Sequence, residues 1–189
     1  MQSRPLVTIA FYLLLIVGHL GAFDVLYFHW WKCRLADRPE CRREVLWHTA
    51  RHVIYGLQFL WVANLRLHGA ALIALAVLYA ADVFVAWADV WEERDSRRAQ
   101  GGLPRGEYLM HIILSVLVGG YMMAVFAACW PDRALPAAVV VEPPQVPVLL
   151  RALMSAMGAT AFVVFAHDLR RWIRWPARME AQGAQGARG

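Results

Sequence analysis

The sequence is poor in the motifs that identify soluble enzymes. It contains no Ser-His-Asp order suited to a hydrolase triad, no nucleotide-binding glycine loop and no Cys-x-x-Cys pair. The glycine segments GGLP and VGGY lack the strand-and-helix context of a phosphate-binding loop. The three cysteines, at positions 33, 41 and 129, are too few and too scattered for a zinc ribbon. These absences exclude a P-loop nucleotide hydrolase, a thiol oxidoreductase and a zinc-ribbon module.

Charge is also scarce, at 17% of the 189 residues, whereas 60% are hydrophobic and the mean hydropathy is +0.43. A soluble domain of this size is less apolar. Five apolar stretches approach or exceed the roughly 20 residues that cross a bilayer, at 5–31, 42–67, 69–93, 105–130 and 146–172. The first lacks a small-residue cleavage site, so we expect it to be retained. The sequence therefore predicts an all-α integral membrane protein with a single domain over 1–175.

Basic residues gather at every second connection between these stretches. They lie within 32–43, again within 170–188, and around the third-to-fourth connection at Arg94, Arg97, Arg98 and Arg105. The positive-inside rule then places the N-terminus outside and the C-terminus in the cytoplasm, in a bacterial-type inner (plasma) membrane. The net charge of +5 is explained by this topology, so we expect a lipid bilayer as partner and no nucleic acid.

The connections predict how the helices pack. A very short turn near His68 and Gly69 makes the second and third helices antiparallel neighbours. Short loops with up-down alternation are typical of an antiparallel four-helix bundle, here a transmembrane one. A longer, proline-rich and extended connection precedes the fifth transmembrane helix. We expect this helix to pack outside the bundle or to cover one face. Contacts through it could also form a homodimer. The segment 176–189 is expected to be a disordered cytoplasmic tail.

Two of the apolar helices carry a Glu followed four residues later by a His. These Glu–His pairs are Glu44 and His48 in EVLWH, and Glu107 and His111 in EYLMH. Residues four apart share one face of a helix, and a face of this kind turned toward lipid is unfavourable. Both pairs should therefore point into the bundle.

Each neighbouring helix adds an aspartate, Asp24 in GAFDVLYF and Asp89 in WADVW. At 1.5 Å per residue, both aspartates and both histidines lie about 7–12 Å below the cytoplasmic interface. Four helices thus deliver carboxylates and imidazoles to one layer, where they are costly unless something binds them. The sequence predicts a site for two divalent metal ions, with the two Glu–His pairs and the two aspartates as ligands.

The arrangement resembles the sites of ferritin-like di-iron carboxylate proteins. There, two helices each give one carboxylate and two others each give a Glu–His pair. The resemblance implies that Asp24 and Asp89 correspond to the single carboxylates, and that iron is the favoured metal, with zinc or manganese as alternatives. The pair spacing in this chain is four residues instead of three.

Five other polar residues in the same helices are expected to be additional ligands or to orient the ligands from behind. Arg51 lies one turn from His48 and is suited to neutralise one carboxylate. The set is His29, Arg51, His52, Asp82 and Glu93.

Several functions remain compatible with such a site. The first is a di-iron-type oxidoreductase acting on a lipid or quinone-like substrate that enters from the bilayer. The second is a zinc-dependent membrane hydrolase, in which the metal lowers the pKa of water. The third is a non-enzymatic metal transporter, sensor or structural site. A heme b protein is less favoured, because heme needs apolar walls and this layer is rich in carboxylates.

Overall fold

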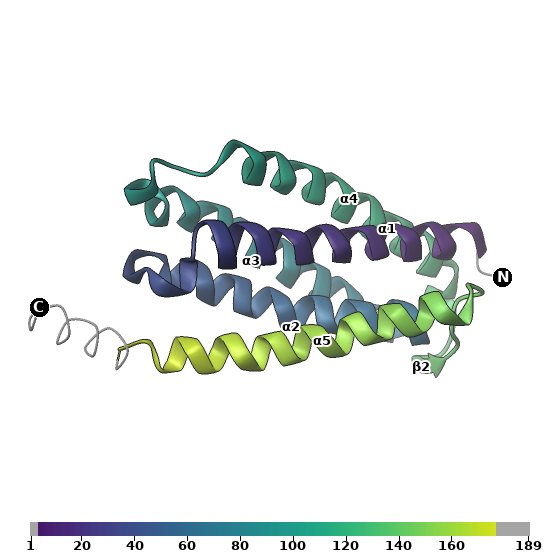
Figure 1. Cartoon of the computed structure of the whole chain (residues 1–189). Coiled ribbons are helices and arrows are strands. Elements are labelled where there is room, and N and C mark those ends of the chain that lie inside the picture. The colour runs from purple at the N-terminus through teal and green to yellow at the C-terminus, as the bar shows by residue number, and fades with distance from the viewer. Residues whose placement is uncertain (1–3, 177–189) are drawn as a thin grey trace, which may run out of the picture.

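The computed structural model describes residues 4–176, and over that range five long helices run along a common axis (Figure 1). They are α1 (Arg4–Phe23), α2 (Arg42–Asn64), α3 (Leu72–Ser96), α4 (Arg105–Cys129) and α5 (Val148–Ile173). The prediction of a helical protein with five long helices is confirmed. Most of the predicted tail lies outside the described residues.

Shorter elements connect the helices. A π-helix, η1 (Asp24–Lys32), continues α1, where the sequence predicted an uninterrupted helix to residue 31. The remaining elements are η2 (Leu35–Asp37), η3 (Pro39–Cys41), β1 (Leu65–His68), η4 (Gly69–Ala71), η5 (Arg98–Gln100), η6 (Trp130–Ala134) and β2 (Ala138–Val141).

Within residues 4–176, four segments are long and apolar enough to cross a membrane. They are Pro5–Asp37, Gly69–Ser96, Arg105–Ala134 and Val148–Ile173. The segment 42–67, expected as a fifth span, forms a long helix but does not reach this hydropathy. The apolar residues of α2 are interrupted by His48, Arg51, His52, Gln58 and Asn64.

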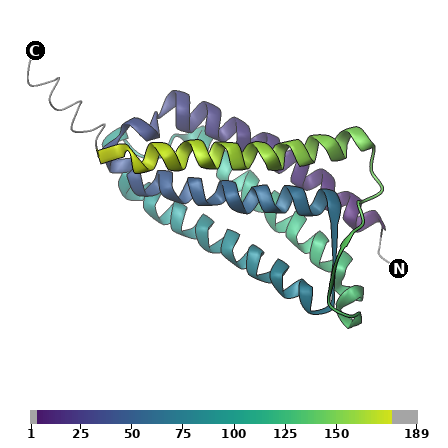
Figure 2. The same ribbon diagram turned by 90° about the horizontal axis from the view of Figure 1, so that it is seen from below.

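The helices form two packed groups. One is α1 against α4, and in the other α2 lies between α3 and α5 (Figures 1 and 2). The fifth helix thus packs along α2 and outside the first four helices. Two glycines allow the α2–α5 approach, because a Cβ at Gly158 would lie 3.1 Å from the carbonyl oxygen of Gly56 and 2.9 Å from Leu60 Cγ.

A small sheet closes one end of the bundle. Strands β1 and β2 pair antiparallel, with Leu65 opposite Val141 and His68 opposite Ala138. The second helix therefore ends at Asn64 and not at residue 67, since the chain is drawn into this ladder. Arg66 fixes the sheet from behind, with Nε 2.9 Å from Asp132 and Nη1 3.0 Å from Glu142.

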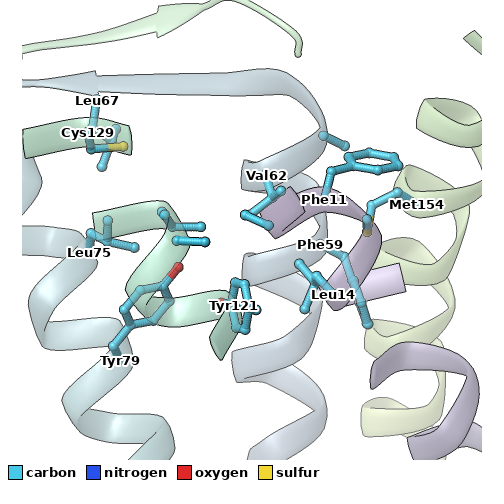
Figure 3. Packing of buried hydrophobic residues seen from close by; sticks show 14 residues of the cluster. Phe11, Leu14, Phe59, Val62, Leu67, Leu75, Tyr79, Tyr121, Cys129 and Met154 are labelled. Carbon is cyan, nitrogen blue, oxygen red and sulfur yellow. The ribbon is translucent and has the colours of Figure 1, made fainter. Parts of the chain in front are cut away.

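The apolar core lies toward this closed end. Side chains of all five helices meet there, among them Phe11, Phe59, Leu75, Tyr121 and Met154 (Figure 3). Burial of these apolar side chains stabilises the packing of the five helices against one another. The opposite end of the bundle is packed differently, since its buried residues are mostly charged or polar.

Replacement of Gly158 by Val should loosen the α2–α5 packing. The added atoms would overpack the contact with Leu60 and the Gly56 backbone, so we expect a loss of about 1–3 kcal/mol in the free energy of unfolding. Unfolding of the detergent-solubilised protein measures it. Gly119→Val is the matched control, because a Cβ there meets nothing within 4 Å. Equal stability of the two variants would show that this close approach does not matter.

Candidate metal centre

A cluster of acidic and imidazole side chains occupies the end of the bundle opposite the sheet. Its acids are almost fully buried: Glu44 and Glu107 have no exposed surface, Asp89 has 1% and Asp24 has 5%. They come from η1, α2, α3 and α4. All six predicted first ligands lie in this end of the bundle, so the structure brings the predicted layer together.

The π-helix determines how the first segment contributes. In an α-helix, residues five apart point about 140° away from each other. In a π-helix the hydrogen bonds run from residue i to i+5, so such residues lie above one another. Asp24 and His29 therefore share a face, and His29 Nε2 lies 3.4 Å from Asp24 Oδ2. Short π-helical segments are rare and frequently mark functional sites.

One group of possible ligands is formed by Asp24, His29 and His111. Asp24 Oδ2 lies 3.4 Å from Nε2 of His29 and 3.4 Å from Nε2 of His111. One possible ligand atom from each of these three residues lies within 4.8 Å of the other two. His29, predicted as a secondary residue, thus belongs to the centre itself.

A second group is formed by Glu44, His48 and Glu93, again with donor atoms within 4.8 Å of one another. Asp89 joins it, because its Oδ1 lies 3.3 Å from His48 Nε2. Glu93, also predicted as secondary, therefore lies in the centre.

The two groups are neighbours. The rings of His29 and His48 have centroids 4.1 Å apart, and His111 Nδ1 lies 3.2 Å from Glu93 Oε1. The two groups can therefore serve as the two halves of one site.

Six donor atoms in the two groups have no hydrogen-bond partner among the described residues. They are Asp24 Oδ1, His29 Nε2, His48 Nε2, Asp89 Oδ1, Glu93 Oε1 and His111 Nε2. The nitrogen–oxygen separations of 3.3–3.4 Å quoted for His29, His48 and His111 match metal ligation. Two atoms that are each about 2.1 Å from one ion are about 3.0–3.4 Å apart at octahedral or tetrahedral angles. The spacing is compatible with ligands of a shared ion and also with ion pairs between imidazolium and carboxylate.

Arg97 occupies the centre in a way the sequence did not reveal. Its guanidinium is fully buried, with Nη2 2.6 Å from Glu44 Oε1 and 2.7 Å from Glu107 Oε1. The charge pattern of the sequence indicates only a topological role for Arg97, and that interpretation is incomplete, since this side chain does not reach solvent. Burial lowers the pKa of Arg97, but the hydrogen bonds and charges of Glu44 and Glu107 outweigh burial and hold the pKa above its ordinary value.

The arginine changes the roles of the two glutamates. Both oxygens of Glu44 are engaged, by Arg97 and by a short hydrogen bond from Ser96 Oγ. Glu107 accepts from Arg97 and from the thiol of Cys33, whose Sγ is 3.8 Å from Oε2. Glu107 Oε1 also lies 3.2 Å from His29 Nε2. Glu107, and Glu44 although it belongs to the second group, are thus already bonded to Arg97 and to a hydroxyl or thiol.

The remaining secondary residues separate into two classes. Arg51 lies beside the centre as expected, with Nη1 3.6 Å from Asp89 Oδ2. Asp82 and His52 lie elsewhere. Asp82 accepts a 2.9 Å hydrogen bond from Gln58, and His52 Nε2 is 3.4 Å from Asp168 of α5. Asp82 and His52 therefore contact Gln58 and Asp168 and not the centre.

The charges of the centre do not balance within the protein. Five buried carboxylates, from Asp24, Glu44, Asp89, Glu93 and Glu107, face the two guanidinium groups of Arg51 and Arg97. Five carboxylates against two guanidinium groups leave an excess of three negative charges, and Asp24 and Glu93 have imidazoles as their close partners. Uncompensated buried charge is very unfavourable, so this end of the bundle needs either protonated imidazoles or bound cations.

A cavity of ≈ 400 Å³ adjoins the centre. Its walls come from α1, η1, α2 and α5, and they are mostly apolar, with Val17, Phe59 and Met157 among them. Asp24, His48, Arg51 and His52 also line the cavity. An apolar molecule could therefore lie with one end against the polar groups.

Comparisons with known proteins add no relative. No protein-family model, no curated protein and no solved structure matches this chain. The functional argument therefore depends on the geometry of the centre and the cavity.

Loss of the Arg97 side chain should destabilise the protein strongly. Arg97→Gln would leave Glu44 and Glu107 buried without a counter-charge, which costs about 3–5 kcal/mol for comparable buried pairs. Chemical unfolding in detergent measures the change. Arg98→Gln is the control, because Arg98 is exposed.

A second variant tests the cause. In a chain that carries Arg97→Gln, the added changes Glu44→Gln and Glu107→Gln should restore much of the stability, because they remove the unpaired charges. A loss that persists unchanged in the triple variant would contradict the electrostatic explanation.

Proposed function

We propose that the protein is a multi-pass membrane protein that holds two metal ions and acts as a di-iron-type oxidoreductase on a lipid or quinone-like substrate. The observation that carries the proposal is the set of six buried donor atoms that have no hydrogen-bond partner within residues 4–176. Three are imidazole nitrogens and three are carboxylate oxygens. Buried polar atoms are nearly always satisfied, so six unsatisfied atoms in one place call for a ligand.

The two groups of residues suggest how the ions would be held. One ion would be bound by Asp24, His29 and His111, and the other by His48 and Glu93 with Asp89. Arg97, Glu44 and Glu107 would form the layer behind, which fixes the positions of ligands and tunes the site. Two divalent ions would also compensate the three unbalanced carboxylates.

The donor set supports iron, manganese or zinc over softer or harder ions. Imidazole with carboxylate suits these metals, whereas thiolate would favour copper(I) and all-oxygen ligands would favour calcium or magnesium. Iron is our choice because an apolar cavity meets the centre, and bound iron supplies redox chemistry with dioxygen. The chain's own part is to bind and orient the substrate and to exclude water.

Heme is a poor fit to the same histidines. Asp24 Oδ2 lies between His29 and His111, 3.4 Å from each, where a porphyrin would need an apolar wall. The rings of His29 and His48 lie 4.1 Å apart, which is too close for two axial ligands on opposite faces of one porphyrin.

The membrane orientation that we propose follows from charge. The metal centre lies at the end of the bundle where the arginines of the η2–η3 and η5 connections are found, which is the cytoplasmic side by the positive-inside rule. α2 would cross with the other helices, since its polar residues face α3, α4 and α5 and not lipid.

Metal analysis of the purified protein tests the centre directly. We expect about two ions per chain for the native protein, and His29→Ala, His48→Ala and His111→Ala should each lower the content to about one or fewer, because each removes one ligand. His19→Ala is the control, since His19 is exposed on α1 and its ring contacts only the Leu15 carbonyl oxygen. Unchanged metal content in all three variants would contradict the proposed metal centre.

The identity and chemistry of the metal form a second test. Iron, with an absorbance change when dioxygen is added to the reduced protein, is the expected result. Two zinc ions without a redox response would contradict the oxidoreductase and favour the hydrolytic or structural alternatives. A Soret band would contradict both and identify heme.

A further inference from the structure

We infer that the cavity beside the centre binds the ring of a membrane quinol, an uncharged aromatic head with two hydroxyl groups and an apolar tail. The inference rests on the proposed function and names its substrate class. It is argued from three properties of the cavity: the charge at its polar side, the aromatic side chains in its wall, and a chain of proton-accepting groups behind it.

Charge at the cavity disfavours an ionic head group. Two carboxylates lie at or directly behind the wall, Asp24 and, behind His52, Asp168. The only guanidinium in the wall, Arg51, is already 3.6 Å from the carboxylate of Asp89. A fatty-acid carboxylate or a phosphate would therefore face more negative than positive charge. The charge at the cavity thus disfavours an anionic head group, and the hydrogen-bonding and aromatic side chains of the wall favour an uncharged ring.

Hydrogen-bonding groups at the same place suit hydroxyl donors. His52 lines the cavity and has an imidazole nitrogen that can accept a hydrogen bond, whereas the donor atoms of Asp24 and His48 are assigned to the proposed ions. Tyr55 accepts a 3.4 Å hydrogen bond from Arg51 Nη2, and its own hydroxyl hydrogen can be donated to a ligand oxygen. The wall can therefore bind a head group that both donates and accepts.

Three aromatic side chains distinguish a ring from a plain alcohol. Trp30, Tyr55 and Phe59 all line the cavity, and aromatic faces favour a flat ring over an alkyl chain of equal area. The rest of the wall is aliphatic, with Val17, Leu153 and Val164 among its residues, and suits the tail. The volume of ≈ 400 Å³ falls within the usual range of small-molecule sites.

A short relay leads from the cavity to the surface. His52 lines the cavity, its Nε2 lies 3.4 Å from Asp168 Oδ2, and Asp168 Oδ1 is 2.9 Å from Nδ1 of the half-exposed His167. Alternating imidazole and carboxylate groups can pass a proton from donor to acceptor. Oxidation of a quinol to a quinone releases two protons and two electrons. The electrons would reduce dioxygen at the proposed metal centre, and a proton accepted by His52 would have a route out through Asp168 and His167.

The test measures binding of decylubiquinol, kept reduced under argon, to the full chain in detergent micelles, with empty micelles subtracted. Decanoate and decanol serve as an anionic and a ring-free comparison. We expect saturable binding of the quinol that is at least tenfold tighter than that of either comparison. Equal or tighter binding of decanoate would overturn the inference in favour of a fatty acid, and equal binding of decanol would show that no ring is recognised.

A pair of glycine variants locates the site. Gly21 lines the cavity and has open space around an added Cβ, so Gly21→Leu should fill the cavity without a clash and weaken quinol binding at least tenfold. Gly119→Leu places the same side chain on an exposed part of α4 and should change binding less than twofold. The same affinity in both variants would overturn the assignment to this cavity.

His52→Gln should weaken quinol binding about threefold to tenfold through one lost or altered hydrogen bond, and His19→Gln, at an exposed ring outside the cavity, should not. Metal content is measured on the same samples. Quinol binding without metal would leave this inference standing while the metal centre fails. Two ions without quinol binding would leave the metal centre standing and overturn this inference.

Discussion

The requirement that buried charges be compensated shapes the polar half of this molecule. The first turns of α2 and α4 bring Glu44 and Glu107 into a region without solvent. The guanidinium of Arg97, at the end of α3, compensates the charges of both carboxylates. Because Arg97 bonds to both, it ties three helix ends together at one point. Asp24, Asp89 and Glu93 are then confined to a small volume in which imidazoles are their nearest partners.

The apolar half serves a complementary purpose. Side chains from all five helices pack together near the β1–β2 sheet, so the helices are held there without help from the charged residues of the centre. A ligand-binding centre needs supporting elements that stay in place whether or not the ligand is bound. The division into an apolar closed end and a polar end provides such support, and the cavity lies where the two regions meet.

Periodicity and depth along the helices were sufficient to predict the five helices and to place six polar residues in one layer. They could not predict the π-helix, because the sequence of Asp24–Lys32 is compatible with a regular α-helix and the shift in register depends on tertiary packing. His29 was therefore underestimated. Arg97 was missed since a basic residue at a helix end usually faces solvent, and only the approach of α2 and α4 makes it a buried partner. Asp82 shares a helix face with Asp89, but a hydrogen bond from Gln58 of α2 holds its carboxylate outside the centre, and the sequence of α3 alone does not predict this contact.

The polarity of α2 bears on how the protein enters a bilayer. A helix with an arginine, two histidines, a glutamine and an asparagine among its apolar residues partitions poorly into lipid when isolated. The tight β1–η4 connection joins it to the apolar α3, and α5 covers its other side only after the rest of the chain has been synthesised. If α2 inserted into a bilayer as a hairpin with α3, the apolar α3 would shield part of its polar side chains from lipid. In a bilayer, stable placement of α2 would therefore depend on its pairing with both α3 and α5.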